Sequence, residues 1–390
     1  MIKTMTAYTY EIDDAEAAVS DILGQLDPEK NLLKNTVGIV SCFADFISSG
    51  VLQAICQALP FETAGTTTLA CAVEGSPETM LLTLIVLTSD DVSFSVGLSA
   101  PLISLEDESP LSDAYEAAAA RLTGRPEMMF SFQPLYSTGG DFSLNALTKI
   151  SGGIPNFGTH AISHNIDYSD SLVIHNGSAY SDRCALILLE GDIRPRFFTS
   201  PISPGKIFQA KGVVTESYGN EVRKVNGVSV ADYLQTLGFR NEDWTISRIS
   251  SFPFVVDYYN DGTTPVARAM LSITPEGCAL GSGNIPVGAT LTVGSINSED
   301  VISTTAQTIS ASLASEKPSG ILMYSCAERY SALDCDPTVE IGKVRELMQE
   351  TGIPYLFAYS GGEICPVHSQ DRDRTPVNRY HNYTFIVCAF

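Results

Sequence analysis

A strand–helix–strand pattern that recurs along the chain constrains its fold more than any other feature. Residues 36–69, 128–162 and 320–363 each begin with an apolar strand-like run, continue as a helix, pass a proline and end in a second strand-like segment near glycine. Such alternation is typical of layered folds in which helices cover a sheet. It also arises by coincidence, so duplication and chance both remain open. We expect an α+β fold with two related halves, each a mixed β-sheet layer flanked by helices.

Further elements are expected outside these units. Residues 12–26 carry apolar residues at helical spacing and acids in the first turn, where the helix dipole favours them. Residues 112–123 predict a helix with Ser112 as N-cap and Gly124 as its stop. The apolar run 80–87 falls far short of the roughly 20 residues that a transmembrane helix needs. We interpret this run as a buried strand and expect no membrane insertion.

The charge of the chain excludes one large class of partners. Lys and Arg total 23 and Asp and Glu total 45 among 390 residues, so the formal net charge is −22. Hydrophobic residues make up 44% of the chain, which is enough for a large core and unlike a disordered acidic tail. Because so acidic a surface repels phosphate backbones, we expect no nucleic-acid partner.

The cysteines and the start of the chain favour a cytoplasmic location. The nine cysteines are scattered, several lie in apolar runs, and none forms a Cys-x-x-Cys pair. We interpret most of them as small buried thiols. The first residues contain no apolar stretch of the kind that a signal peptide has.

Established catalytic motifs are missing from the sequence. It contains no G-x-S-x-G, no Walker A loop, no H-E-x-x-H and no G-x-G-x-x-G after a strand. His160 and His164 have helical spacing, but they follow a glycine-rich segment in which the chain is expected to be extended. We therefore expect no catalytic residue, no metal site and no cofactor.

Polar residues at the ends of two C-terminal strands are the candidates for a ligand site. Cys326 and Arg329 follow a strong apolar strand, and a guanidinium there suits a carboxylate or a phosphate, with a salt bridge to an acid as the alternative. Glu363 follows two glycines that allow close approach of a ligand, or else it caps a turn. Asn382 and Thr384 enter the last strand, where they either contact ligand or tie the strand down.

In their order and spacing, these residues resemble the FIST family, named for F-box and intracellular signal transduction proteins. The C-terminal part of the pattern comprises Cys326, Arg329, Glu340, Gly362, Glu363, Asn382 and Thr384. The N-terminal part comprises Gly65, the segment 152–158 with Gly153 and Gly158, the segment 184–193, and the Asn226-Gly227 turn. One departure is the segment 200–205, which stands where the family commonly has a Gly-Cys-x-Pro-like loop.

The resemblance implies a domain division and a sensory function. It implies an N-terminal helical lead-in at 1–30, a FIST N-terminal-like domain at 31–225 and a FIST C-terminal-like domain at 226–390. The expected function is a small-molecule sensor for an amino-acid-like ligand, acting through a separate signalling protein such as a histidine kinase. The implied ligand-binding residues are Cys326, Arg329, Glu363, Asn382, Thr384, Gly153 and Gly158.

Two alternatives remain open beside the sensor. Cys326 could be a nucleophile activated by Arg329 and a distant histidine such as His381, against the simpler interpretation as a buried thiol. A haem-binding gas sensor would need a His or Cys axial ligand, for which Cys365 is a candidate.

Overall fold

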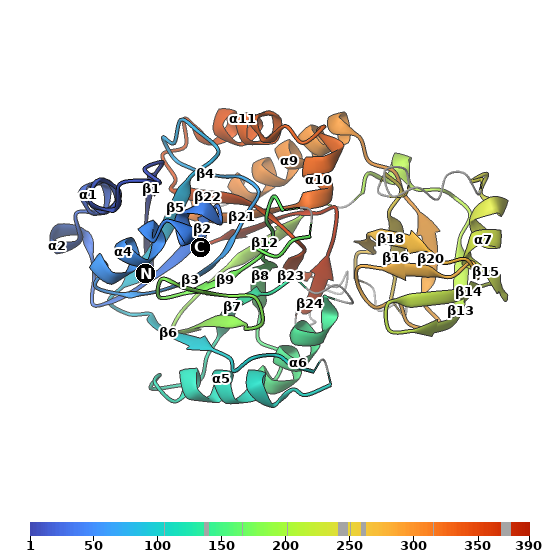
Figure 1. The fold of residues 1–390 in the computed structure, drawn as a ribbon, viewed down its shortest axis with the longest axis horizontal. Coiled ribbons are helices and arrows are strands. Elements are labelled where there is room, and N and C mark those ends of the chain that lie inside the picture. The colour runs from blue at the N-terminus through green and yellow to red at the C-terminus, as the bar shows by residue number, and fades with distance from the viewer. Residues whose placement is uncertain are drawn as a thin grey trace.

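The ribbon in Figure 1 separates a large body from a smaller domain beside it. The large body comprises residues 1–200 and 297–390, and the smaller one, the inserted domain, comprises residues 207–294. The computed structural model describes residues 1–104, 106–135, 140–165, 167–200, 202–240, 249, 251–258, 263–314, 316–367 and 376–390.

The large body is built from three units that share one order of elements: strand, helix, strand, helix, strand and returning strand. Unit 1 comprises β1 (Lys3–Thr9), α1 (Ala15–Leu26), β2 (Asn35–Cys42), α4 (Val51–Ala58), β3 (Glu62–Thr67) and β5 (Leu82–Ser89), with the short helices α2 (Pro28–Asn31) and α3 (Asp45–Ser48) between them. Unit 2 comprises β6 (Ser93–Leu98), α5 (Ser109–Ala119), β7 (Met128–Gln133), α6 (Asp141–Ser151), β8 (Asn156–His160) and β11 (Ala185–Glu190). Unit 3 comprises β12 (Arg196–Thr199), α9 (Ser298–Leu313), β21 (Ile321–Cys326), α10 (Ala327–Ala332), α11 (Pro337–Met348), β22 (Tyr355–Ser360) and β25 (Phe385–Ala389).

The three units also share one sheet topology. Their strand orders are β1-β5-β2-β3, β6-β11-β7-β8 and β12-β25-β21-β22. The pairs β2–β3, β7–β8 and β21–β22 are parallel, and the neighbouring pairs in each unit are antiparallel. The expected α+β class, with mixed sheets flanked by helices and repeated strand–helix–strand units, is confirmed.

Each unit adds a short strand to the sheet of another unit, and the three exchanges form a cycle. In each unit this short strand follows the third strand. Unit 1 gives β4 (Cys71–Val73) to β22, unit 2 gives β9 (Val173–His175) with its hairpin partner β10 (Ser178–Tyr180) to β3, and unit 3 gives β23 (Glu363–Val367) with its partner β24 (Val377–His381) to β8. Since each unit completes a neighbour's sheet, the three form one body.

The apolar residues follow the same threefold plan. One face of each sheet contributes to a shared central core, which includes Ile85 of unit 1, Phe130 of unit 2 and Leu322 of unit 3. The opposite face of each sheet packs on helices, with α1 and α4 on unit 1, α5 and α6 on unit 2, and α9 and α11 on unit 3. Burial of these faces drives the assembly of the body.

The inserted domain interrupts unit 3 between β12 and α9. Its sheet has the order β17-β16-β20-β13-β14-β19-β18, with β15 paired to β14. Its elements are β13 (Gly212–Tyr218), β14 (Glu221–Val225), β15 (Val228–Ser229), α7 (Val230–Thr236), β16 (Phe254–Asp257), β17 (Val266–Arg268), β18 (Met270–Ile273), β19 (Ala279–Gly281) and β20 (Thr290–Val293), and the turn η1 (Pro204–Lys206) precedes it. The expected domain boundary at 225/226 lies between β14 and β15, within the inserted domain. It therefore differs from the boundary between the large body and the inserted domain, and it stays a prediction.

Two local expectations from the sequence need correction. The segment 1–30 is not only helical, because β1 pairs along its whole length with β5. The helix expected at 112–123 is α5, whose N-cap is Glu108. Ser112 does not cap it, because its hydroxyl donates to the Glu116 carboxylate within the helix at 3.3 Å.

Within the part of the chain that the structure describes, no helix is both long and apolar enough to cross a membrane.

Candidate functional site

The carboxyl ends of the parallel strands of all three units meet at one place in the large body. Backbone N–H groups donate across the units there, from Ile162 to the Thr67 carbonyl at 3.3 Å, from Tyr359 to the Ala70 carbonyl at 3.0 Å and from Gly361 to the His160 carbonyl at 3.0 Å. This closed ring of strand ends fixes the loops that follow. Loops at the carboxyl ends of parallel strands are a common place for ligand sites in α/β layers.

A pocket of about 380 Å³ lies between these strand ends and the inserted domain. The large body contributes Leu135, Ile162, Asp167, Tyr168, Cys326, Ala327, Glu328, Gly361, Tyr380 and Asn382, and the inserted domain contributes Ala269, Leu271 and Ser282. The structure therefore brings two of the predicted ligand residues, Cys326 and Asn382, into one cavity.

Cys326 ends β21 and is buried. Burial raises the pKa of its thiol well above the ordinary value, and the nearby carboxyls of Glu363 and Glu328 raise it further. The thiol is therefore protonated near neutral pH, which is the opposite of an activated nucleophile. The histidine considered as its base lines a separate pocket, its Nε2 is 3.2 Å from the Cys365 carbonyl oxygen, and burial lowers the pKa of His381 to about 3.

Arg329 is fully buried in an ion pair. Its Nη2 is 2.8 Å from Glu340 Oε1, and its Nε donates to the Ser325 hydroxyl at 3.1 Å. Its remaining donors meet Thr304, Thr305 and the Val301 carbonyl. With 1% of the residue exposed and its donors occupied, the guanidinium cannot hold a ligand carboxylate. The structure thus corrects that role in favour of the salt bridge that the sequence left as its alternative.

Glu363 begins β23 behind Cys326 and does not line the pocket. Its exposed fraction is 0%. Burial raises the pKa of its carboxyl well above the ordinary value, although Ser360, Cys326 and Arg329 act in the opposite direction. The fold therefore favours the neutral form of this buried carboxyl, which lies next to Cys326.

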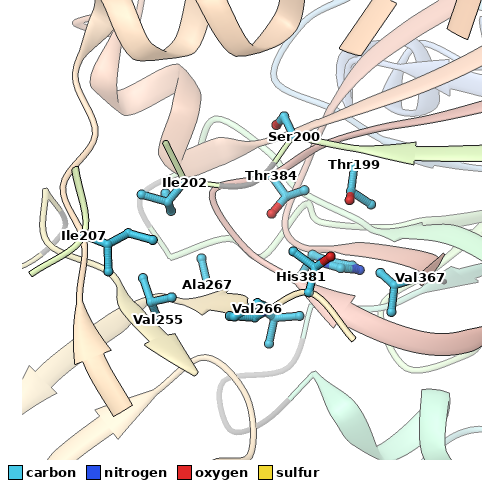
Figure 2. A pocket seen from close by; sticks show the side chains of 12 residues that line it. Thr199, Ser200, Ile202, Ile207, Val255, Val266, Ala267, Val367, His381 and Thr384 are labelled. Carbon is cyan, nitrogen blue, oxygen red and sulfur yellow. The ribbon is translucent and has the colours of Figure 1, made fainter. Parts of the chain in front are cut away.

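Asn382 and Thr384 face different cavities. The Asn382 amide donates from Nδ2 to the Tyr380 hydroxyl at 3.2 Å, and the Ser282 hydroxyl of the inserted domain donates to its Oδ1. Thr384 lines a second pocket of about 190 Å³, where its hydroxyl donates to the Asn382 carbonyl at 2.8 Å. Figure 2 shows that this second pocket is surrounded mainly by carbon atoms, with Ile207 and Val255 of the inserted domain opposite Thr384 and His381.

The two predicted glycines lie outside both pockets. Gly153 follows α6 with a φ of +83°, and its N–H donates to the Thr148 carbonyl at 2.8 Å, as at many helix ends. Gly158 lies in β8, where an added Cβ would be 1.9 Å from the Ser131 carbonyl oxygen. Gly65 has the same relation to Val40 in unit 1, at 1.8 Å, so both glycines permit close pairing of the parallel strands.

The structure also locates Cys365, the candidate haem ligand, and can be searched for a metal site. Cys365 lies in β23 with its side chain in the central core, and burial raises the pKa of its thiol. Over the described ranges, no group of three or more His, Cys, Asp or Glu side chains is arranged to hold a metal ion. The expected absence of a cofactor stays a prediction.

Glu328 is the main lining residue that sequence reasoning missed. It follows Cys326 by two residues, and burial raises the pKa of its carboxyl to about 7. It is half-buried, and among the described residues its carboxylate has neither a hydrogen bond nor an ion pair. Its place in Cys-Ala-Glu-Arg directly after a strand was an available signal. Tyr380, Ser282, Asp167 and Tyr168 come from distant segments and had none.

Arg268 attaches the inserted domain to the large body beside the pocket. It ends β17, and its Nη2 is 3.3 Å from Asp141 Oδ1 at the start of α6. Its Nη1 donates to the Tyr380 carbonyl at 2.6 Å, and the backbone N–H of Asn284 donates to Asp141 Oδ2 at 2.5 Å. Since Tyr380 also lines the pocket, this attachment and the pocket share a residue.

Comparison with known proteins finds two adjoining family domains. The FIST N domain model matches residues 36–228, and the FIST C domain model matches residues 230–366. A search of the curated proteins finds no match. The solved structures include one titled "Cyanuric acid hydrolase: evolutionary innovation by structural concatenation", 9% identical over 100% of this chain and 98% of that chain, with a TM-score of 0.32. Another is phosphoribosylformylglycinamidine synthase II from Thermotoga maritima, 9% identical over 99% and 71% of the two chains, with a TM-score of 0.22. TM-scores this low carry no argument.

Proposed function

The chain belongs to the FIST family, whose domains are generally sensory and signal-transduction domains, and we propose that it binds a small molecule in the pocket beside Cys326 and Asn382. In this proposal the protein acts in the cytoplasm and passes the signal to a separate signalling protein. The proposed ligand is of the size of an amino acid.

The observation that carries the proposal is the composition of the pocket wall. A cavity of about 380 Å³ is within the usual range of small-molecule sites, about 300–1,000 Å³. Its wall combines apolar side chains such as Ile162 and Leu271 with convergent polar groups such as Asn382 and Glu328. That combination provides both burial and orientation of a ligand.

The position of the pocket supports a sensory role. The large body and the inserted domain both line it, so a bound ligand would contact both. A ligand that fits one arrangement of the two domains better than others shifts the population toward that arrangement. The Arg268 attachment, which shares Tyr380 with the pocket, is the element that such a shift would change.

A thermal-shift screen of amino acids, amines and small acids tests the proposal. A ligand that binds only the folded state raises stability by about 2.7 kcal/mol at a hundredfold excess over its dissociation constant. Leu271→Trp fills the pocket from the inserted domain without removing a polar group. Val287→Trp places the same side chain at a position of the inserted domain that is 53% exposed and is the matched control.

We expect at least one compound to raise the melting temperature of the wild type and of Val287→Trp but not of Leu271→Trp. If no compound shifts the wild type, or if Leu271→Trp keeps every shift, the proposed site is wrong.

A further inference from the structure

The charged groups of the 380 Å³ pocket have one sign. Its acidic lining residues are Glu328 and Asp167, and no Lys, Arg or His is among the described residues that line it. The two buried guanidiniums nearby are committed elsewhere, Arg329 to Glu340 and Arg268 to Asp141. Among the described residues of the pocket wall, a ligand carboxylate would therefore find no cation.

Glu328 is an unpartnered carboxyl at the edge of an apolar cavity. Among the described residues it has no hydrogen bond or ion pair, and burial opposes its ionisation. A carboxylate in this condition gains most from a ligand that brings the opposite charge and a donor. Asp167 lies on the exposed loop at the pocket rim, where a hydrogen bond with Ser169 lowers its pKa and keeps it charged.

The rest of the wall is suited to the remainder of such a ligand. Leu135, Ile162 and Leu271 offer apolar contact. Tyr168, which is 51% exposed, lines the pocket next to Asp167 in the sequence, and an aromatic ring attracts a cation over its face.

From this arrangement we infer that the pocket binds an organic ammonium ion that carries an apolar group and no carboxylate. Its ammonium group contacts Glu328 and Asp167, and its apolar group contacts Leu135, Ile162 and Leu271. The inference rests on the proposed function, of which it names the ligand class. The formal net charge of −22 acts in the same sense, because the field of the protein attracts cations and repels anions.

Three probes with the same phenyl group and different charge test this inference. They are phenethylamine, a cation; phenylalanine, a zwitterion; and hydrocinnamate, an anion. Calorimetric titration of the full chain at pH 8 should show phenethylamine binding at least tenfold more tightly than phenylalanine, with no detectable binding of hydrocinnamate.

Two variants separate the local carboxylate from the long-range field. Glu328→Gln removes the carboxylate with little change of shape and should weaken phenethylamine binding at least tenfold. Glu350→Gln removes the same charge from an exposed position two residues after α11 and should leave the affinity unchanged. Asp167→Asn, at the exposed rim, gives a second variant of the site if Glu328→Gln does not fold, and it should also weaken phenethylamine binding.

The pH dependence of phenethylamine binding is a further test of the inference. Asp167 and Tyr168 face the pocket from the loop after β8, Cys326 from β21 and Tyr380 from β24. Asp167 stays charged because its pKa is lowered, and burial raises the pKa of Cys326 and Tyr380, which stay neutral. Glu363 lies behind Cys326, and burial also raises its pKa. Since Glu328 ionises near pH 7, phenethylamine binding should tighten several-fold from pH 6 to pH 8 in the wild type and not in Glu328→Gln.

Three results would overturn the ammonium assignment. They are phenylalanine or hydrocinnamate binding as tightly as phenethylamine, no binding of phenethylamine at millimolar concentration, and unchanged phenethylamine affinity in Glu328→Gln. None of these overturns the proposed function, which depends instead on whether Leu271→Trp blocks the compounds found in the screen.

Discussion

Arg329 and Glu340 form a charge pair from which water is excluded, with exposed fractions of 1% and 0%. Removing one partner of a buried pair leaves the other charge uncompensated and costs about 3–5 kcal/mol. We therefore expect Arg329→Met to lower the free energy of unfolding by about that amount, measured by urea denaturation.

The double variant Arg329→Met/Glu340→Met is the control for this interpretation. It removes both charges and replaces them by apolar groups, which is often nearly neutral or even stabilising. It should be more stable than Arg329→Met alone. A double variant that loses the sum of the two single effects would show that the two residues act independently.

The raised pKa of Glu363 predicts that the free energy of unfolding depends on pH. Burial raises the pKa of its carboxyl in the folded protein, so the folded state holds the proton over a pH range in which the unfolded chain has lost it. Stability is then greatest below the unfolded pKa of about 4.3 and falls as the pH rises towards the folded pKa, by at most about 1.4 kcal/mol per unit. Glu363→Gln removes this loss, so its stability relative to wild type should increase between pH 5 and pH 8 in denaturation experiments. A constant difference across that range would mean that the fold does not raise the pKa of Glu363.

Part of the site could be predicted residue by residue from the sequence. Cys326 and Asn382 lie at the ends of apolar strands, and that position alone places them at a sheet edge. The partner of Arg329 could not be predicted, because a guanidinium after a strand suits a ligand and a buried acid equally well. Glu328 was overlooked although it stands in the same Cys-Ala-Glu-Arg segment, because the sequence does not show that its carboxyl is buried without a partner among the described residues.

The close pairing of the parallel strands β7 and β8 explains why position 158 is a glycine. Because an added Cβ would be 1.9 Å from the Ser131 carbonyl oxygen, Gly158→Ala must push β7 and β8 apart. Such overpacking costs about 1–3 kcal/mol or more, and we expect that loss in thermal or urea unfolding.

Gly342 offers the matched control within the same chain. It lies exposed in α11 with no atom near an added Cβ. Gly342→Ala should therefore stabilise the protein by about 0.5–1 kcal/mol through helix propensity. If Gly158→Ala were equally harmless, close strand pairing would not explain this glycine.

The strand–helix–strand units were visible in the sequence because each is built from local signals. Runs such as 128–133 and 321–326 are mostly apolar, and the helices that follow have their own periodicity. The exchange of β4, β9 and β23 between units was not visible, because the partner of a strand is decided by contacts far apart in the chain. β1 was missed because its buried positions do not alternate regularly.

In the whole molecule, the candidate site lies between the large body and the inserted domain. Arg268 is buried and connects the two through Asp141 and Tyr380. Arg268→Met should weaken that attachment. Loss of about 1.4 kcal/mol raises the open population tenfold, and proteolysis follows that population.

We expect limited proteolysis of Arg268→Met between the two domains to be roughly tenfold faster than that of the wild type. Arg223→Met is the matched control, because Arg223 lies on the same domain in half-exposed ion pairs with Glu216 and Glu221. Equal cleavage rates for the two variants would show that Arg268 does not hold the inserted domain in place.

We propose that a small molecule binds between the strand ends of the large body and the inserted domain. A crystal structure with the compound that most raises the melting temperature would locate the binding site. We expect ligand density in contact with Glu328 and Asn382 and beneath Leu271. Density at another place, such as the separate cleft of about 450 Å³ lined by Phe43, His164 and Tyr330, would contradict it.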